Sequence, residues 1–514
     1  MGWASDPPQL SDINTRKHLT KLIMSQEWQL KNPSISLYPF HLRDDRDEGY
    51  KQVAKNAQIL WENLADNVGK EFNINELNSL RDKLICYQNG VYYPDGEGEN
   101  LTLVKLLIPD GKTLNFQPIT QPDNQKLDGF IYALRLQDTY TADLTFYYKN
   151  VTIKVAELTR LNPEGCLLLK AIQPSLGQTL LLYATPAVYN TYRKLADESV
   201  KAFVQDKQPE SVGFRAEGKL FGSPIFEYDS REDDARLRCH ILVWLQDNPQ
   251  TLKFATPAFY SYLMNLLCSR AKIVFVYGEA RKKYRQAQQI VRELEKKLPE
   301  FSQIEREQDR QVKLQKLKEL LAEVHTKMLA FAQQVRYLQE DRNTIDTNAE
   351  NYGEALTRIR GLCISGDNLD FWQRFLDLAE DKYRRQIEID LNYLIASQNL
   401  FQQSISTVRG MVDIEQVELD REQMELYKQQ EDREKKRSRQ LENIIFFVGT
   451  AICGGQIFSA AYPLIKDTRI QWQPDFSLPL HPFAATIILS LLFGLLFGLL
   501  MLGIVLLVRK TFPR

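Results

Sequence analysis

The sequence FAATIILSLLFGLLFGLLMLGIVLLV, residues 483–508, contains no charged side chain and is apolar on every face over 487–508. A second uncharged run, NIIFFVGTAICGGQIFSAAYPLI, occupies residues 443–465. Each run is longer than the roughly 20 residues that a helix needs to cross a hydrocarbon core about 30 Å thick. A pair of buried core helices is the alternative, but an all-round apolar helix that ends at a basic pair favours a span. The sequence therefore predicts two transmembrane helices.

Basic residues lie just before the first run and just after the second. They are Lys435, Lys436, Arg437 and Arg439 before the first, and Arg509, Lys510 and Arg514 after the second. By the positive-inside rule, both ends of the chain are cytoplasmic. The linker 466–482 is then the outside loop, and it is too short to be a domain. The N-terminus lacks the basic start and apolar stretch of a signal peptide. We expect an integral protein of an inner or plasma membrane with a large cytoplasmic part.

The whole chain has an ordinary globular composition. It holds 514 residues, with 65 Lys and Arg against 66 Asp and Glu, 44% hydrophobic residues and 25% charged residues. These values exclude disordered, collagen-like and disulfide-scaffold classes, and a net charge of -1 gives no reason to expect nucleic acid as a partner. Six scattered cysteines without CxxC fit a reducing compartment.

Motifs for catalysis are absent from the sequence. It contains no GxxxxGK[ST], GxGxxG, HExxH or GxSxG pattern, so we expect no enzyme and no cofactor. The acidic run 229–234 is interpreted as a solvated loop, and the pair Cys239 and His240 as part of a core. No spacing suggests metal ligands, and the identity of any metal site stays open.

Residues 1–270 are predicted to form a cytoplasmic α/β sensor domain. Val53, Ala57, Leu60, Trp61, Leu64 and Val68 lie at helical spacing. Runs rich in β-branched and aromatic residues predict strands at 101–108, 130–136, 144–148, 151–156, 166–172, 179–183 and 241–245.

An internal echo occurs within this domain. Residues 178–189 read QTLLLYATPAVY and residues 250–260 read QTLKFATPAFY. Each copy is predicted to be a strand followed by a helix, with Thr185 and Thr256 as N-caps and a proline at the first helical position. This suggests two related subdomains, at about 100–200 and 212–270. Free N–H groups at these helix starts could bind an anion, although simple capping explains the pattern as well.

Residues 271–442 are predicted to form a stalk of long helices, interrupted near Pro299. From Leu369 to the end of the first span the sequence holds no proline before Pro463, so one helix is expected to run from the stalk into the membrane. Its stretch 428–440 is polar all round, which a helix tolerates through ion pairs or within an assembly.

The first span carries a polar and small-residue stripe. At about 100° per residue, one face holds Gly449, Cys453, Gln456, Ala460 and Pro463. We also assign Ser459 to the predicted pore lining. The opposite face holds Phe447, Ala451 and Phe458. Helix packing and an aqueous path are both consistent with this stripe. The GxxxG pattern of Gly494 and Gly498 in the second span is expected to contact the first span.

This order of parts resembles the CorA-type divalent-cation transporters: an α+β cytoplasmic domain, a long-helix stalk, a two-helix transmembrane hairpin and the basic tail 509–514. The resemblance covers about residues 270–514 in layout and implies a funnel-like homopentamer, with a divalent cation as a candidate transported ion. The family's Gly-Met-Asn motif is missing, since the corresponding stretch reads Ser459-Ala460-Ala461-Tyr462-Pro463. That departure argues against a magnesium filter.

Two function classes follow. The first is a weakly selective CorA-like ion channel or transporter that is gated by the cytoplasmic domain. The second is a membrane-anchored oligomeric sensor or effector, for example in a stress or antiviral response, whose N-terminal domain binds a small ligand or nucleotide. The expected partners are the lipid bilayer, further copies of the chain and a small molecule.

Overall fold

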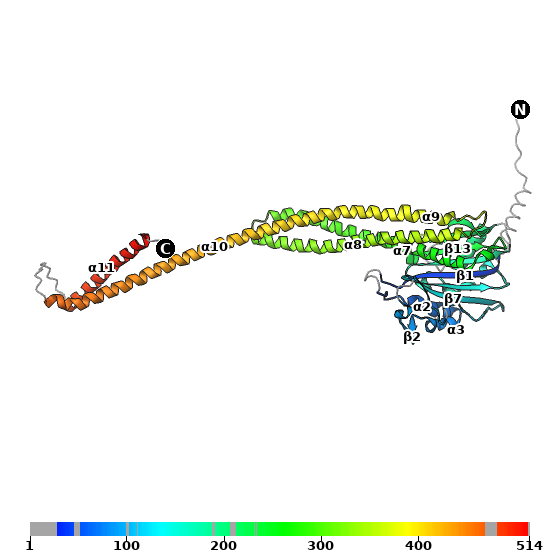
Figure 1. Cartoon of the computed structure of the whole chain (residues 1–514), viewed down its shortest axis with the longest axis horizontal. Helices are drawn as coiled ribbons and strands as arrows, with labels where there is room; N and C mark the ends of the chain where they lie inside the picture. The colour runs from blue at the N-terminus through cyan, green and yellow to red at the C-terminus, as the bar shows by residue number, and fades with distance from the viewer. Residues whose placement is uncertain are drawn as a thin grey trace, which may run out of the picture. The chain divides into compact units, whose positions relative to one another are not determined.

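The computed structural model describes residues 28–45, 52–98, 102–109, 111–187, 191–205, 212–230, 232, 234–467 and 481–511. It divides the chain into two compact units. The first comprises the chain up to Leu298 together with Val324–Gln403, and the second comprises Pro299–Glu323 together with the chain from Ser404 onward. The predicted α+β part, long helices and C-terminal apolar helix are all present (Figure 1).

The first unit is built on one mixed sheet, whose main path runs β11-β12-β13-β10-β1-β8-β7-β4. β5 and β6 also pair with β7, and β9 pairs with β1. Neighbours are antiparallel except β10 and β13, which run parallel. The bounds are β1 Gln29–Leu42, β4 Leu103–Lys105, β5 Leu114–Asn115, β6 Ile119–Thr120, β7 Lys126–Leu136, β8 Thr139–Tyr148, β9 Thr152–Lys154, β10 Gln178–Pro186, β11 Gly213–Leu220, β12 Ser223–Asp229 and β13 Cys239–Leu245.

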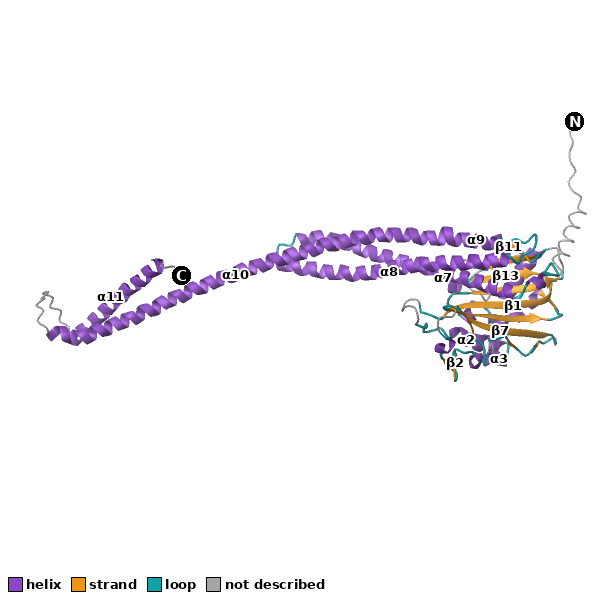
Figure 2. Cartoon of the chain, viewed as in Figure 1, coloured by secondary structure: helices purple, strands orange, loops and turns teal. Residues whose placement is uncertain are grey.

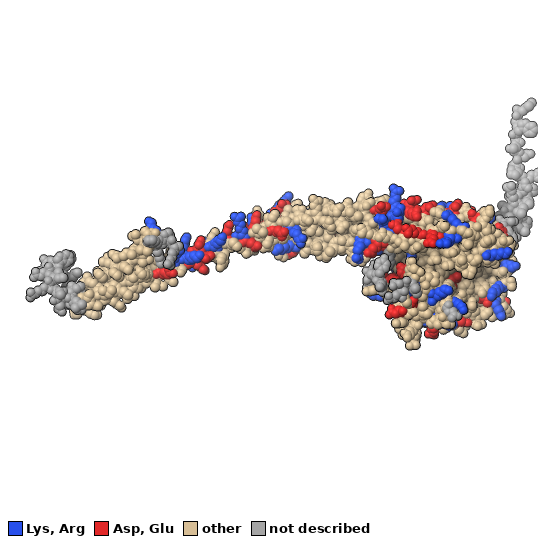
Figure 3. All heavy atoms as spheres, viewed as in Figure 1, with Lys and Arg blue, Asp and Glu red and all other residues tan. Residues whose placement is uncertain are grey.

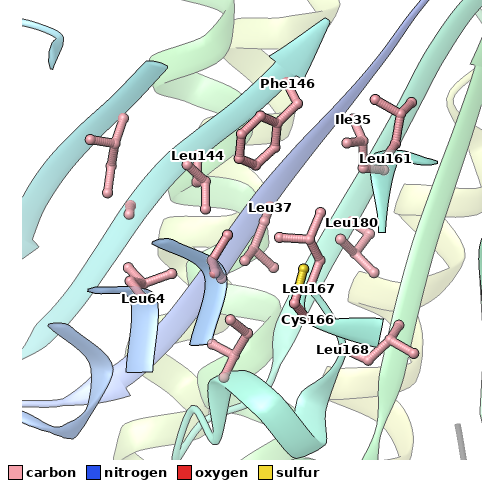
Figure 4. Close-up of a cluster of buried hydrophobic side chains, with 14 of the residues drawn as sticks. Ile35, Leu37, Leu64, Leu144, Phe146, Leu161, Cys166, Leu167, Leu168 and Leu180 are labelled. Atoms are coloured by element: carbon pink, nitrogen blue, oxygen red, sulfur yellow. The ribbon is translucent and has the colours of Figure 1, made fainter. Parts of the chain in front are cut away.

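The two faces of this sheet have separate cores. One face packs under short helices and α5 (Tyr192–Val204), with Leu37, Leu144 and Leu180 buried against Leu64 and Leu167 (Figure 4). The other face packs against α7 (Pro257–Glu305), α8 (Arg310–Arg360) and α9 (Asp370–Leu378). Its core contains large aromatic side chains from sheet and helices: Tyr38, Trp244, Phe259, Tyr352 and Trp372. The sheet is therefore sandwiched between two helical layers, and Figure 2 shows its strands together in one layer.

Several predicted strands are confirmed, at β7, β8, β10 and β13, while those at 101–108 and 151–156 are shorter than predicted. The predicted strand at 166–172 is wrong, because this segment forms a turn and the short helix α4 (Leu169–Ile172). There, the backbone of Leu167 bonds to side chains and not to a neighbouring strand. Asn162 Oδ1 accepts from the Leu167 amide at 2.9 Å, and Gln178 Nε2 donates to the Leu167 carbonyl at 2.7 Å.

The helix predicted at 53–68 begins later, at Ile59 with α2 (Ile59–Asn63), and continues as a π-helix over Leu64–Gly69. Its predicted apolar face is buried from Ala57 onward. Further short elements are α3 (Asn75–Asn78), α6 (Thr251–Phe254) and a hairpin of β2 (Tyr87–Gln88) and β3 (Val91–Tyr92). Pro299 does not interrupt its helix, since α7 continues to Glu305.

The second unit contains the end of α7, the start of α8, most of α10 (Arg385–Asp467) and α11 (Pro482–Thr511). Leu314 and Leu317 of α8 pack against Val408, Val412 and Leu419 of α10. Beyond this cluster, every residue from Asp420 to Glu442 is exposed, including the whole stretch 428–440 that is polar all round in the sequence. α9 passes through a π-helix at Ala379–Arg384 into α10, so the expected long helix into the first apolar run is present.

Candidate functional site

Two helices of the structure are long and apolar enough to cross a membrane, namely the helix that ends in the first apolar run and Phe483–Val508 of α11. α11 runs back along α10 as a hairpin (Figure 1). Over this hairpin the face in view carries uncharged side chains, and charged ones gather on α10 where it enters the hairpin (Figure 3). Most of the loop that was predicted to lie outside, including Pro474 and Asp475, falls beyond the described residues, as does Arg514.

One face of α10 packs closely on α11. A Cβ atom built on Gly454 would lie 2.9 Å from the Phe497 ring, and one on Gly498 would lie 3.0 Å from Phe447 and 3.1 Å from Ala451. Phe458 and Phe493 stack with ring centroids 5.1 Å apart. The predicted contact between GxxxG and the first span is confirmed.

The stripe of small and polar residues lies on the other side of α10. Gly449, Cys453, Gln456 and Ala460 are all exposed within the single chain. At about 100° per residue, the stripe is centred about 180° from the face that packs on α11. The bulky face of α10 therefore packs on α11 within the hairpin, and the stripe is exposed on the opposite face.

Ser459 lies apart from the stripe, on a flank of the hairpin. A groove of about 650 Å³ between α10 and α11 is lined by Ser459 and Gln456 together with Thr486 and Ser490. Thr486 and Ser490 are the polar side chains of the second apolar run. Among the described residues, the buried Ser490 hydroxyl has no hydrogen-bond partner. Gln456 thus belongs to the stripe and also lines this groove.

The two threonines of the internal echo have different environments. Thr256 caps α7, because the Phe259 amide donates to its Oγ1 at 3.3 Å and Pro257 opens the helix. The prediction for Thr185 is wrong: this residue lies in β10, and its hydroxyl donates to Gln246 Oε1 at 2.8 Å. The segment after Gln250 forms α6 where a strand was predicted.

A buried charge cluster that was not predicted from the sequence lies between the sheet and α7. Arg270 of α7 donates to Asp229 Oδ2 at 3.0 Å and lies 3.4 Å from Glu227 Oε1, both on β12. His240 of β13 lies 3.1 Å from the same Glu227 oxygen and 2.8 Å from the Thr179 hydroxyl. All four charged or titratable groups are at most 8% exposed. Asp229 is therefore buried and paired, contrary to the predicted solvated loop.

Burial controls the titration of this cluster. Burial, reinforced by the charge of Arg270, lowers the pKa of His240, so this ring is neutral near pH 7. Burial alone would raise the pKa of Glu227, but the His240 hydrogen bond and the Arg270 charge lower it overall. The spacing of Glu227 and Asp229, two residues apart on one strand face, was the sequence feature that could have indicated the cluster.

Within the described part of the chain, no group of three or more His, Cys, Asp or Glu side chains could hold a metal ion. No protein-family model matches the chain, and no curated protein matches it either.

Proposed function

We propose that this protein is an oligomeric, weakly selective membrane ion channel or transporter whose first span lines the ion path. The orientation of the stripe carries the proposal. Gly449, Cys453 and Ala460 are exposed on the face of α10 opposite α11, and the exposed Gln456 lies at the edge of that face, so copies of the chain could meet around an axis with these residues inside. Small side chains let neighbouring helices approach, and Gln456 supplies an amide where lipid offers no hydrogen bond.

Self-association has a second line of support outside the apolar run. All residues of the all-round polar stretch 428–440 are exposed within the single chain. A helix stretch that is polar all round and buries none of its side chains is weakly stable in water, because most helical stability comes from packing. Further copies of α10 would supply that packing. We propose a homo-oligomer, and the CorA-like layout favours a pentamer.

Weak selectivity follows from the chemistry of the proposed path. A ring of Gln456 amides offers dipoles and no net charge, so it can replace part of an ion's hydration shell without strong discrimination by valence. The family's Gly-Met-Asn filter is absent from the chain. We therefore expect both monovalent and divalent cations to pass.

The proposed orientation places both ends of the chain in the cytoplasm, with the α/β unit as the regulatory part. A cysteine placed at Gln473 should react with an impermeant thiol reagent added outside, whereas one placed at Ser438 should react from the cytoplasmic side. The reverse pattern would contradict this orientation.

The alternative is a membrane-anchored oligomeric sensor or effector, in which the spans hold the assembly together without conducting. The same small-residue stripe favours this alternative, since small residues also mark helix contacts. Ion flux through purified protein in proteoliposomes, together with the mass of the detergent-solubilised particle, separates the two. Flux above that of empty vesicles from a particle of several subunits supports the channel. An oligomer without flux supports the anchored sensor, and a monomer in detergent and in native lipid contradicts both.

A further inference from the structure

The first unit contains a cleft of about 970 Å³ that the ion-path proposal does not use. Its walls come from the end of β1, the turn between α4 and β10, the segment before β13 and one face of α7. This volume lies at the upper end of the range for sites that hold metabolites and cofactors, about 300–1,000 Å³. It is larger than a single ion or small amino acid needs.

The α7 wall presents three chemically different side chains in a row. Phe275, Glu279 and Lys283 line the cleft at intervals of four residues, which places them on one helix face over about 12 Å. The row offers an aromatic ring, then a carboxylate, then an ammonium group. This order is complementary to the base, the ribose hydroxyls and the phosphate of a nucleotide.

The ammonium end of the row is held in place. Lys283 Nζ contacts both oxygens of Asp341, at 3.0 and 3.1 Å, and the Asp341 side chain is fully buried. The same Nζ lies 5.2 Å from the centre of the Tyr337 ring, so the ammonium group is fixed at the wall of the cleft and its charge faces a ligand there. Glu279 is held by Lys282 Nζ at 2.7 Å, and a carboxylate can accept several hydrogen bonds.

Further cations lie on the other walls. Arg236 uses two donors on Asp234, at 3.0 and 2.6 Å, and retains three of its five N–H donors. Lys170 of α4 lines the cleft and is exposed. Four carboxylates also line the cleft: Asp44, Asp45, Asp234 and Glu279. Asp44 is ion-paired with Arg43 and Asp234 with Arg236, which reduces their repulsion of an anion.

We propose that this cleft binds a mononucleotide, with the base on Phe275, the ribose hydroxyls at Glu279 and the phosphate at Lys283. Aromatic rings stack on bases, carboxylates bind ribose hydroxyls in dinucleotide sites, and lysines bind phosphates as point charges. Because the ligand would touch both α7 and the loops at the end of the sheet, its binding would alter how these elements pack. Nucleotide binding in the cleft does not depend on the proposed function. Only the further consequence, that binding regulates the ion path, rests on it.

The test measures binding to the full-length protein in lipid nanodiscs by calorimetry, with AMP, GMP and 2′,3′-dideoxy-AMP as probes. We expect AMP or GMP to bind with Kd below about 1 mM, and removal of the ribose hydroxyls to weaken AMP binding about tenfold. Glu279→Gln should remove that preference, so that AMP and its dideoxy analogue bind alike. Lys170→Glu should weaken AMP binding, whereas Lys253→Glu, an exposed lysine outside the cleft, should not.

Photolabelling of the wild-type chain with 8-azido-AMP provides a test that needs no variant. Labelled peptides should include the α7 segment around Phe275. Failure of both AMP and GMP to bind below about 1 mM, a ribose preference unchanged in Glu279→Gln, or label only outside the cleft would each overturn the proposal. None of these outcomes depends on ion flux. A negative result would therefore contradict nucleotide binding without contradicting the proposed ion path. Nucleotide binding without flux would contradict only the ion path.

Discussion

Gly494 of α11 lies directly against the Ala451 carbonyl oxygen of α10, so that no side chain can fit between the two helices there. A Cβ atom at position 494 would collide with that oxygen and would also lie 3.2 Å from the Gly455 amide nitrogen. Both obstacles are backbone atoms, which cannot rotate away as a side chain can. The hairpin therefore depends on glycine at this position.

Gly494→Val should disrupt the hairpin. The valine side chain would force α11 away from α10, and we expect a lower thermal midpoint and a loss of the monodisperse peak in detergent chromatography. Gly503→Val is the matched control in the same helix, because a Cβ at Gly503 meets no neighbouring group of the described residues within 4 Å. Equal behaviour of the two variants would show that the close approach of α10 and α11 is not needed.

Cys453 provides a chemical probe of the stripe. It is the exposed cysteine of the six, whereas Cys86, Cys166, Cys239 and Cys268 are buried and Cys363 is half-buried. If the stripe lines the path, a small positively charged methanethiosulfonate should react with Cys453 and reduce cation flux severalfold. Cys453→Ala should conduct and be insensitive to the reagent. Inhibition that persists in Cys453→Ala would place the reactive group elsewhere.

Arg270→Met should strongly destabilise the first unit. The substitution keeps an apolar side chain of similar length but leaves the Glu227 and Asp229 carboxylates buried without their partner from α7. Breaking a buried pair in this way costs about 3–5 kcal/mol, which denaturant unfolding monitored by tryptophan fluorescence would detect. A change below about 1 kcal/mol, the scale of surface ion pairs, would mean that the cluster is hydrated in solution.

The buried histidines predict a loss of stability towards acid. Burial lowers the pKa of both His41 and His240 below that of the unfolded chain, about 6.5. The unfolded chain therefore binds more protons than the folded chain once the pH falls below about 6.5. The free energy of unfolding decreases as the pH is lowered through that window. The thermal midpoint should drop between pH 7.5 and 5.5, and His240→Gln should reduce that drop. His325→Gln, at an exposed position of α8, is the control and should leave the drop as in wild type.

The two long apolar helices could be predicted from the sequence because each contains a long run without a charged residue. Their mutual packing followed as well, since Gly494 and Gly498 mark a close helix contact. β1 was missed, although it pairs with β8 and β10 in the middle of the sheet. Its two prolines, Pro33 and Pro39, argue against a central strand by the usual rule, and only the neighbouring strands make that position favourable.

The internal echo shows how tertiary context overrides local similarity. The letters QTL occur in β10 and again at the start of α6. In the first copy Leu180 and Leu182 are buried in the sheet core, whereas in the second copy Leu252 is 58% exposed and precedes a lysine. The copies share residues but not surroundings. The charge cluster at Arg270 was missed for a related reason, because the spacing of Glu227 and Asp229 on one strand does not show which residues of β13 and α7 will pack against them.

The central claim is that the face of the first span opposite α11 lines an ion path, and Gln456→Leu tests it most directly. The control is Thr450→Val, which also removes a polar group from this span, but one whose hydroxyl donates to the Phe446 carbonyl of its own helix at 2.7 Å. Cation flux is measured in proteoliposomes with both variants at equal, verified oligomer content. We predict that Gln456→Leu lowers flux at least about tenfold, which corresponds to a rise of about 1.4 kcal/mol or more in the barrier. Thr450→Val should conduct as wild type. Wild-type flux through an intact Gln456→Leu oligomer would contradict the claim.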